Sequence, residues 1–201
     1  MQAHNKASEW FDALYQKNKS THENIPWARQ AVNPLLQTYL DEETNHKGTA
    51  LVIGCGLGDD AKALEDAGYD VTAIDVSQTA LDLAKERFAN SSVTFIKQDI
   101  FEYTQTFDFV FEALTVQSLP IAFREKMIKA VAGTVAQGGR LLLVAHKKEE
   151  AFDGPPWPLT QEEVELFKSC GLTELSHELH TEDSKISNTR FRVLYEKEGK
   201  V

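Results

Sequence analysis

Three closely spaced glycines follow a short apolar run in the stretch LVIGCGLGDDA, residues 51–61. Gly54, Gly56 and Gly58 carry no side chain, so a ligand could lie directly against the backbone there. Asp75 comes 21 residues after Gly54, at the end of the apolar run VTAIDV. A carboxylate at that distance can accept hydrogen bonds from both hydroxyls of a ribose. The glycines alone would also fit a tight strand-to-helix turn, but glycines and acid together indicate a nucleoside site.

The spacing of the glycines bears on which nucleoside binds. Dinucleotide sites favour G-x-G-x-x-G, and Asp59 stands where the last glycine of that pattern would be. Asp59 and Asp60 would repel a diphosphate, whereas a ligand with a sulfonium and an ammonium group would tolerate them. S-adenosylmethionine carries both groups and a ribose, and we therefore expect it as the cofactor.

Strands and helices must alternate to place these residues at one edge of a sheet. Five apolar runs predict strands, and they are TALVIG, YDVTAIDV, VTFIKQDI, FDFVFEAL and RLLLVAH. Helical stretches lie between them, and the one that starts at Arg124 is predicted to end at Gly138 and Gly139. This order predicts a mostly parallel α/β sheet with helices on both faces, whose ligands bind beyond the carboxyl ends of the strands.

The flanking segments predict additions to this core. ASEWFDALYQK predicts a helix, and Asn33 with Pro34 predicts the start of another. Thr160 and Glu163 predict a capping box for a late helix, followed by two strand-like runs, LTELSHELH and RFRVLYEKE. We expect residues 1–47 to form an N-terminal helical segment and residues 48–201 to form the cofactor-binding domain, within a single globular unit.

The motifs, taken in order, resemble a known family. LVIGCGLGDDA, VTAIDVS, FIKQDIF and FDFVFEALTVQSLP are similar to the successive binding motifs of class I S-adenosylmethionine-dependent methyltransferases. NIPWA, DGPPWPLTQEEVELFKSCGL and RFRVLYEK are similar to the branch that includes thiopurine, halide and tellurite methyltransferases. The resemblance implies a Rossmann-like doubly wound sheet, mostly parallel with an antiparallel C-terminal strand, and an N-terminal helical lid.

The resemblance also implies where the cofactor binds. Gly54, Gly56 and Gly58 would pass beneath its methionine and ribose portions, and Asp75 would bind the ribose hydroxyls. Cys55, in the same loop, is expected to be a small buried residue without thiol chemistry.

Four further residues receive cofactor roles from the resemblance. Val76 and Ile100 would pack on the adenine, although both would also fit ordinary core positions at strand ends. Asp99 would accept a hydrogen bond from the adenine amino group, or would simply cap a turn. Glu112, near the end of the fourth predicted strand, would face the methionine end.

Aromatic residues outside the predicted core are candidates for a lid over the acceptor. Trp10, Trp27 and Trp157 lie in segments that could fold over the strand ends, or could simply pin those segments to the sheet. Trp157 stands in the stiff sequence GPPWP. A flat aromatic there could stack on a planar acceptor or attract a sulfonium by a cation–π interaction.

Polar residues after the fourth and fifth predicted strands are candidates for acceptor binding or catalysis. His146 and Glu112 are the candidates for a general base, which is needed only when the acceptor must lose a proton. Thr115 and Gln117 could point hydrogen-bonding groups at the cofactor or acceptor, or could belong to a capped turn.

The composition of the chain limits the classes of molecule that it is expected to bind. The formal net charge of -10 argues against gripping nucleic acid or a membrane surface. Two cysteines are too few for a disulfide framework or a metal cluster, so no metal is expected. No secretory signal or membrane-spanning run is present, which favours a cytoplasmic monomer or homodimer.

The sequence therefore predicts a methyltransferase acting on a small molecule, such as a thiol, another S, O or N nucleophile, a halide or a metalloid. Two alternatives remain: a non-catalytic module that binds S-adenosylmethionine or another nucleoside, and an NAD(P)-dependent oxidoreductase.

Overall fold

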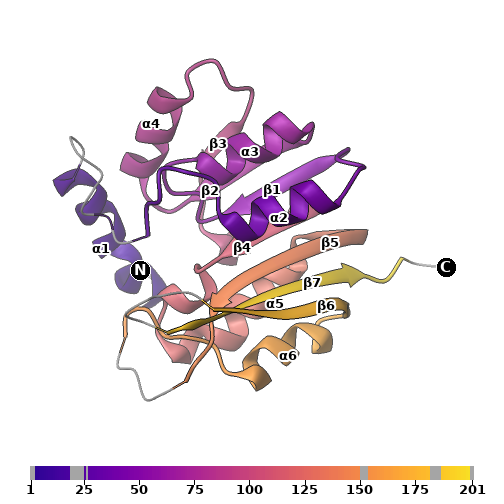
Figure 1. Cartoon of the computed structure of the whole chain (residues 1–201). Coiled ribbons are helices and arrows are strands. Elements are labelled where there is room, and N and C mark those ends of the chain that lie inside the picture. Colours follow the sequence, from indigo (N-terminus) through magenta and orange to yellow (C-terminus); the bar gives the residue numbers. More distant parts are fainter. Residues whose placement is uncertain (1–2, 19–24, 26, 150–153, 182–186, 200–201) are drawn as a thin grey trace. The chain divides into compact units, whose positions relative to one another are not determined.

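The computed structural model describes residues 3–18, 25, 27–149, 154–181 and 187–199, with backbone alone for residues 3–9 (Figure 1). The chain divides into two compact units, Met1–Asp99 and Ile100–Val201. The predicted lid segment lies within the first unit, and its boundary at residue 47 stays a prediction.

The first unit is built on three parallel strands in the order β3-β2-β1. They are β1 (Thr49–Ile53), β2 (Asp70–Asp75) and β3 (Thr94–Lys97), as the sequence predicted. Helix α3 (Asp59–Ala67) connects β1 to β2, and α4 (Gln78–Arg87) connects β2 to β3. Ile53 is in register with Ile74, so β1 and β2 end side by side and their following loops share one edge.

Two more helices of this unit precede β1. α1 (Ala3–Lys17) packs on α4, and α2 (Pro34–Glu42) packs on α3. The side chain of Asn33 accepts a hydrogen bond from the Leu35 amide, and Pro34 occupies the first turn, so the predicted start of α2 is confirmed.

The second unit holds four strands in the order β4-β5-β7-β6. β4 (Phe107–Ala113) and β5 (Val135–His146) are parallel, whereas β7 (Thr189–Lys197) runs antiparallel to both β5 and β6 (Leu172–Thr181). Two helices, α5 (Arg124–Gly133) and α6 (Gln161–Ser169), and three short 3₁₀ turns complete it: η1 (Ile100–Glu102), η2 (Val116–Ser118) and η3 (Ile121–Phe123). The predicted antiparallel C-terminal strand is confirmed.

One predicted boundary is wrong. The helix expected to run to Gly138 and Gly139 ends at Gly133, and Val135 already pairs with Phe107 of β4. The register between the two strands then shifts, and a Cβ on Gly139 would lie 2.8 Å from the Phe107 carbonyl oxygen. Gly139 therefore belongs to a bulge where backbones approach closely, and Gly138 beside it has a φ of 75°, so neither residue ends a helix.

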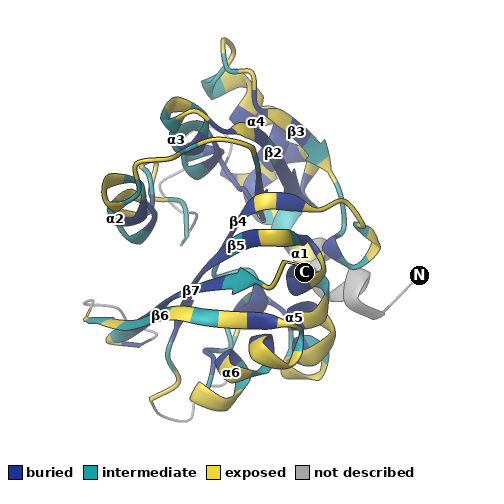
Figure 2. Ribbon diagram, turned by 90° about the vertical axis from the view of Figure 1, so that its right-hand side faces the viewer, coloured by how far each residue is buried: buried dark blue, intermediate teal, exposed yellow. Residues whose placement is uncertain are grey.

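Burial follows the strands in each unit (Figure 2). β1 is buried from Ala50 to Ile53, and β5 is buried from Leu141 to His146. Such continuous burial is typical of strands covered on both faces. β6 alternates, and its Leu175 and Leu179 are exposed. None of the helices in the described ranges has the length and apolar character that crossing a membrane requires.

Candidate functional site

The glycine loop between β1 and α3 has one exposed and two buried glycines. Gly54 is exposed, whereas Gly56 and Gly58 are buried and have φ of 52° and 85°. A Cβ on Gly58 would lie 3.0 Å from the Ala84 Cβ and 3.1 Å from the Phe95 ring. Gly58 is therefore needed for internal packing, and the ligand contact implied for it has no support in this geometry.

The amide groups of this loop bind the chain itself. Cys55 N–H donates to the Ile74 carbonyl at 3.0 Å, and Gly56 N–H donates to Asp75 Oδ2 at 2.9 Å. Gly58 N–H donates to the Cys55 carbonyl at 3.0 Å. A diphosphate site needs such amides free to bind phosphate oxygens. The loop is therefore poorly suited to a dinucleotide.

Asp75 is the buried carboxylate at the end of β2. Its Oδ1 accepts the Ser77 amide at 2.8 Å, while Oδ2 accepts the Gly56 amide. Burial raises the pKa of Asp75, so these two amides only partly offset the loss of water. Each carboxylate oxygen keeps lone-pair capacity for one more donor. This geometry fits a ribose with two neighbouring hydroxyls.

Asp59 and Asp60 do not act as the sequence argument assumed. Arg87 holds Asp59 in a bidentate pair, with both N–O distances 2.7 Å. Asp60 accepts the Asn33 amide at 2.7 Å, and burial raises its pKa to about 6. The expectation that both acids repel a diphosphate is therefore corrected, and the occupied loop amides provide the argument against a dinucleotide instead.

The remaining residues predicted in the first unit lie near the same edge. Cys55 is buried, and burial raises the pKa of its thiol, which agrees with a structural role. Val76 and Asp99 are half-buried; Val76 directly follows β2, and Asp99 lies two residues after the end of β3. The Gln98 amide donates to the Asp75 carbonyl at 3.0 Å and keeps the two strand ends together.

In the second unit, Ile100 is buried in η1 and Glu112 is fully buried in β4. Glu112 Oε1 accepts the Val116 amide at 2.8 Å, while Oε2 has no hydrogen-bond partner within the described part of the chain. Burial raises the pKa of Glu112 to about 7.

Gln117 joins the ends of two segments of this unit. Its side-chain oxygen accepts the His146 amide at 2.7 Å, and its carbonyl accepts the Trp157 amide at 2.7 Å. His146 is buried at the end of β5. The Thr115 hydroxyl contacts the Ala113 carbonyl at 3.4 Å. Gln117 therefore brings the predicted residues His146 and Trp157 close together.

Arg124 is a residue of this cluster that the sequence did not single out. It is buried at the start of α5, and its Nη2 donates to the Trp157 carbonyl at 2.7 Å. Its Nε lies 3.5 Å from Glu163 Oε1. Trp157 is thus held through its backbone on both sides, by Gln117 and by Arg124. In the sequence, the sign of this role was an arginine at the start of a predicted helix.

An aromatic cluster in the segment before β1 contacts the glycine loop through Tyr15. Trp27 Nε1 donates to the Tyr15 hydroxyl at 2.8 Å, and that oxygen lies 2.8 Å from where a Cβ on Gly56 would be. Trp10 stacks on Phe11 and meets Trp27 edge-on. Trp27 is thus packed within the segment, and Tyr15, which the sequence analysis passed over, lies directly on the loop.

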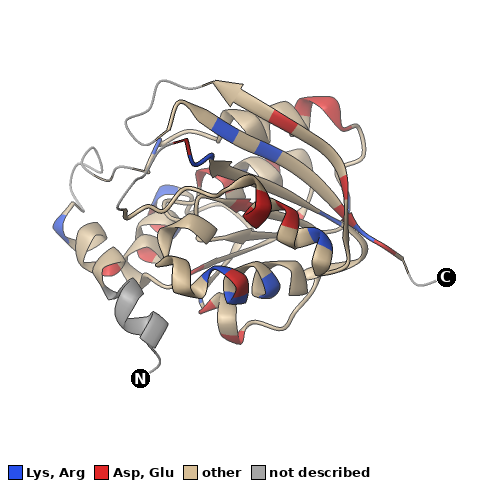
Figure 3. Cartoon of the chain, turned by 90° about the horizontal axis from the view of Figure 1, so that it is seen from below, with Lys and Arg blue, Asp and Glu red and all other residues tan. Residues whose placement is uncertain are grey.

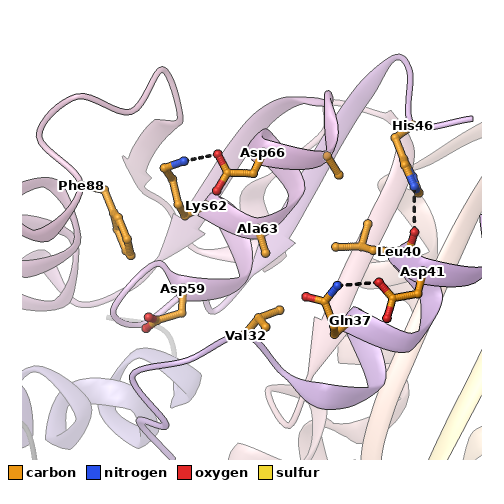
Figure 4. A pocket seen from close by; sticks show the side chains of 11 residues that line it. Val32, Gln37, Leu40, Asp41, His46, Asp59, Lys62, Ala63, Asp66 and Phe88 are labelled. Atoms are coloured by element: carbon orange, nitrogen blue, oxygen red, sulfur yellow. Dashed lines mark hydrogen bonds and ion pairs between the residues drawn. The ribbon is translucent and has the colours of Figure 1, made fainter.

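A shallow groove of about 530 Å³ lies apart from these residues, between α2 and α3 (Figure 4). Several of its polar side chains are paired within it, as Lys62 is with Asp66 and Gln37 is with Asp41. None of the predicted site residues lines it.

Comparison with known proteins agrees with this geometry. The magnesium protoporphyrin IX methyltransferase of Synechocystis PCC 6803, solved with bound S-adenosylmethionine, is similar over 98% of both chains, with a TM-score of 0.74 and 16% identity. The fold is that of the class I methyltransferases.

Sequence comparison specifies the family. The model of the thiopurine S-methyltransferase family matches residues 11–197, and the chain belongs to that family. Thiocyanate methyltransferase 1 of Arabidopsis thaliana is 28% identical over 81% of this chain and 77% of its own length. Thiopurine S-methyltransferase of Vibrio vulnificus (strain YJ016) is 26% identical over 85% of this chain and 88% of its own. The protein is an S-adenosylmethionine-dependent methyltransferase that acts on a small molecule.

Proposed function

We propose that the first unit binds the cofactor through Gly54, Asp75, Val76 and Asp99, while Gly56, buried under the Tyr15 hydroxyl, orients Asp75 through its amide. The observation that carries this proposal is the buried Asp75 carboxylate, oriented by two backbone amides beside an exposed glycine. For the second unit, we propose the two roles that the family resemblance implies: Ile100 contacts the adenine, and Glu112 faces the methionine end.

Replacing Asp75 tests the cofactor site. Asp75→Asn keeps one acceptor oxygen but loses the charge, and we expect it to weaken S-adenosylhomocysteine binding about 30-fold, as for lost hydrogen bonds to a charged group. Isothermal titration measures the affinity, and circular dichroism checks the fold. Asp70→Asn, at the exposed start of the same strand, is the matched control. Unchanged affinity in a folded Asp75→Asn protein would contradict the assignment.

We further propose that the acceptor is a sulfur nucleophile that is ionised at neutral pH. When bound, S-adenosylmethionine supplies an electrophilic methyl group, so an ionised sulfur would need no general base. In the second unit, Glu112 Oε1 and Gln117 Oε1 accept amides of their own chain, so these atoms position loops. The relatives named for thiocyanate and thiopurines support the same acceptor class.

Matched acceptors test this second proposal. Thiocyanate, a small aromatic thiol and a thiopurine would be compared with the phenol and aniline of the same ring, with S-adenosylhomocysteine production as the readout. We expect turnover with the sulfur compounds, and a rate with each thiol that rises with pH through the pKa of that thiol. Faster turnover of the phenol or aniline would contradict the proposal.

We also propose a cytoplasmic enzyme that is a monomer or homodimer. Both cysteines, Cys55 and Cys170, are free thiols, which suits a reducing compartment. Light scattering on the purified chain tests the oligomeric state, and a trimer or larger assembly would contradict it.

A further inference from the structure

Asp12 of the lid helix α1 binds the start of α4, far away in the sequence. Its Oδ1 accepts the Ser77 hydroxyl at 2.6 Å and the Thr79 amide at 3.0 Å. Its Oδ2 accepts the Gln16 side-chain amide at 2.7 Å, within α1. Hydrogen bonds from three donors lower the pKa of Asp12, so the side chain is ionised at neutral pH.

Helix α4 has its own cap without Asp12. Ser77 is the N-cap residue, and its hydroxyl oxygen accepts the Ala80 amide at 3.0 Å. A local cap of this kind is the usual way to satisfy the first turn of a helix. Asp12 adds a second acceptor and a negative charge at the positive end of α4, and this addition connects α1 to α4.

Ser77 links this contact to the proposed ribose site. Its amide donates to Asp75 Oδ1, while its hydroxyl donates to Asp12. Ser77 is fully buried, so its bond to Asp75 is shielded from water, whereas its bond to Asp12 is partly buried. Asp12, Ser77 and Asp75 thus form a continuous chain of hydrogen bonds.

The same face of α1 also reaches the other side of Asp75. Tyr15 follows Asp12 by three residues, which places both on one side of the helix. Its hydroxyl lies over Gly56, whose amide binds Asp75 Oδ2. α1 therefore contacts both residues that orient the Asp75 carboxylate.

From this geometry we infer that Asp12 is a positioning residue for the cofactor: it fixes the lid helix to the turn that orients the ribose carboxylate. The inference rests on the proposed cofactor site. Lid docking and cofactor binding share the Asp75–Ser77 turn, so each stabilises the other. Asp12 contacts no ligand in this scheme and acts through Ser77.

Two substitutions at Asp12 distinguish the effect of its hydrogen bonds from the effect of its charge. Asp12→Ala removes the acceptor, and we expect S-adenosylhomocysteine Kd and the KM for S-adenosylmethionine to rise about tenfold, with kcat changed less than about twofold. Asp12→Asn keeps an oxygen at the Oδ1 position and should remain within about threefold of the parent protein. Asp82→Ala removes an exposed hydrogen bond on the same α4 helix and serves as the matched control.

Hydrogen exchange gives a second readout. We expect S-adenosylhomocysteine to slow amide exchange in two segments, residues 77–82 and α1. This slowing should occur both in the parent protein and in Asp12→Asn. In Asp12→Ala, the α1 protection should be lost. If Asp12→Ala fails to fold, Asp12→Ser shortens the side chain away from the Ser77 hydroxyl but leaves the Ser77 cap of α4 in place, and it should raise the Kd in the same direction.

The outcomes distinguish the positioning role of Asp12 from the proposed cofactor site on which it rests. If Asp75→Asn loses the ligand but Asp12→Ala binds it as tightly as the parent protein, the cofactor site stands and the positioning role fails. If Asp12→Ala only lowers the melting temperature, its role is structural and the inference is overturned. If Asp75→Asn binds normally, the site itself is wrong.

Discussion

Gly58 adopts a left-handed backbone conformation beneath Ala84 and Phe95. An alanine there would meet both the strain of positive φ and the overpacking of two neighbours. We therefore expect Gly58→Ala to lower the free energy of unfolding by about 3 kcal/mol, measured by denaturant titration. Gly133→Ala is the control, because a Cβ there has no neighbour within 4 Å. Equal stabilities of the two variants would show that Gly58 is not required for packing.

Glu112 makes stability depend on pH. Burial raises its pKa from 4.5 to about 7 in the folded protein, so the folded state holds a proton that the unfolded chain releases near pH 4.5. The stabilising effect of that proton is full below pH 4.5, and it is lost as pH rises to about 7. Above that range the folded protein buries a charge.

Glu112→Gln removes this titration and can keep the acceptor for the Val116 amide. We expect the variant to match the parent protein near pH 4.5 and to exceed its free energy of unfolding at pH 8, by on the order of 2 kcal/mol. Urea titrations at the two pH values measure this difference. An equal difference at both values would mean that the Glu112 carboxyl does not carry the pH dependence.

At this scale the sequence indicated the proposed cofactor residues more clearly than the residues that support them. Asp75 was identifiable because its distance from the glycines is characteristic. Asp12 and Tyr15 were not, since both stand inside an ordinary amphipathic helix, and their partners, Ser77 and Gly56, are more than 40 residues away. Contacts between distant segments leave no local pattern.

Among the elements, α5 holds Trp157, in the segment before α6, through the side chain of Arg124. Arg124 of α5 donates to the Trp157 carbonyl, and Glu163 of α6 lies beside the same guanidinium. If Trp157 contacts the acceptor, loss of this anchor should raise the KM for the acceptor. Arg124→Met is expected to raise it about tenfold, with cofactor affinity changed less than about twofold.

Steady-state kinetics with varied acceptor measure the effect. Lys129→Met makes the same change of charge on α5 but breaks only an exposed ion pair with Glu125, and it should leave both constants unchanged. A rise in cofactor Kd with no change in acceptor KM would refute the role assigned to the loop.

Element boundaries were predictable where a side chain marks them. Asn33 caps α2, and the Thr160–Glu163 capping box begins α6, as the sequence indicated. The boundary between α5 and β5 was missed because Gly138 and Gly139 resemble a helix end. The reason for Gly139 is the close approach of the β4 backbone, which is a tertiary contact and leaves no local pattern.

For the whole molecule, charge is the property that the sequence states most directly. Acidic residues exceed basic ones, 31 to 21, and in the part of the chain that the structure describes, Lys and Arg are dispersed among Asp and Glu (Figure 3). A net negative field attracts cations and repels anions over distances comparable to the Debye length. The two substrates of the proposed reaction carry opposite net charge, so the field should act on them in opposite directions.

S-adenosylmethionine carries one more positive than negative charge, whereas thiocyanate and thiolates are anions. Raising the ionic strength from about 0.01 M to about 0.15 M should therefore lower kcat/KM for S-adenosylmethionine and raise it for an anionic acceptor, each several-fold. A neutral thiol below its pKa provides the control, because its binding step should not respond. If the kcat/KM values for S-adenosylmethionine and for the anionic acceptor both fell, positive groups near the acceptor site would outweigh the net charge of the protein. Attraction of an anionic acceptor would then come from those local groups.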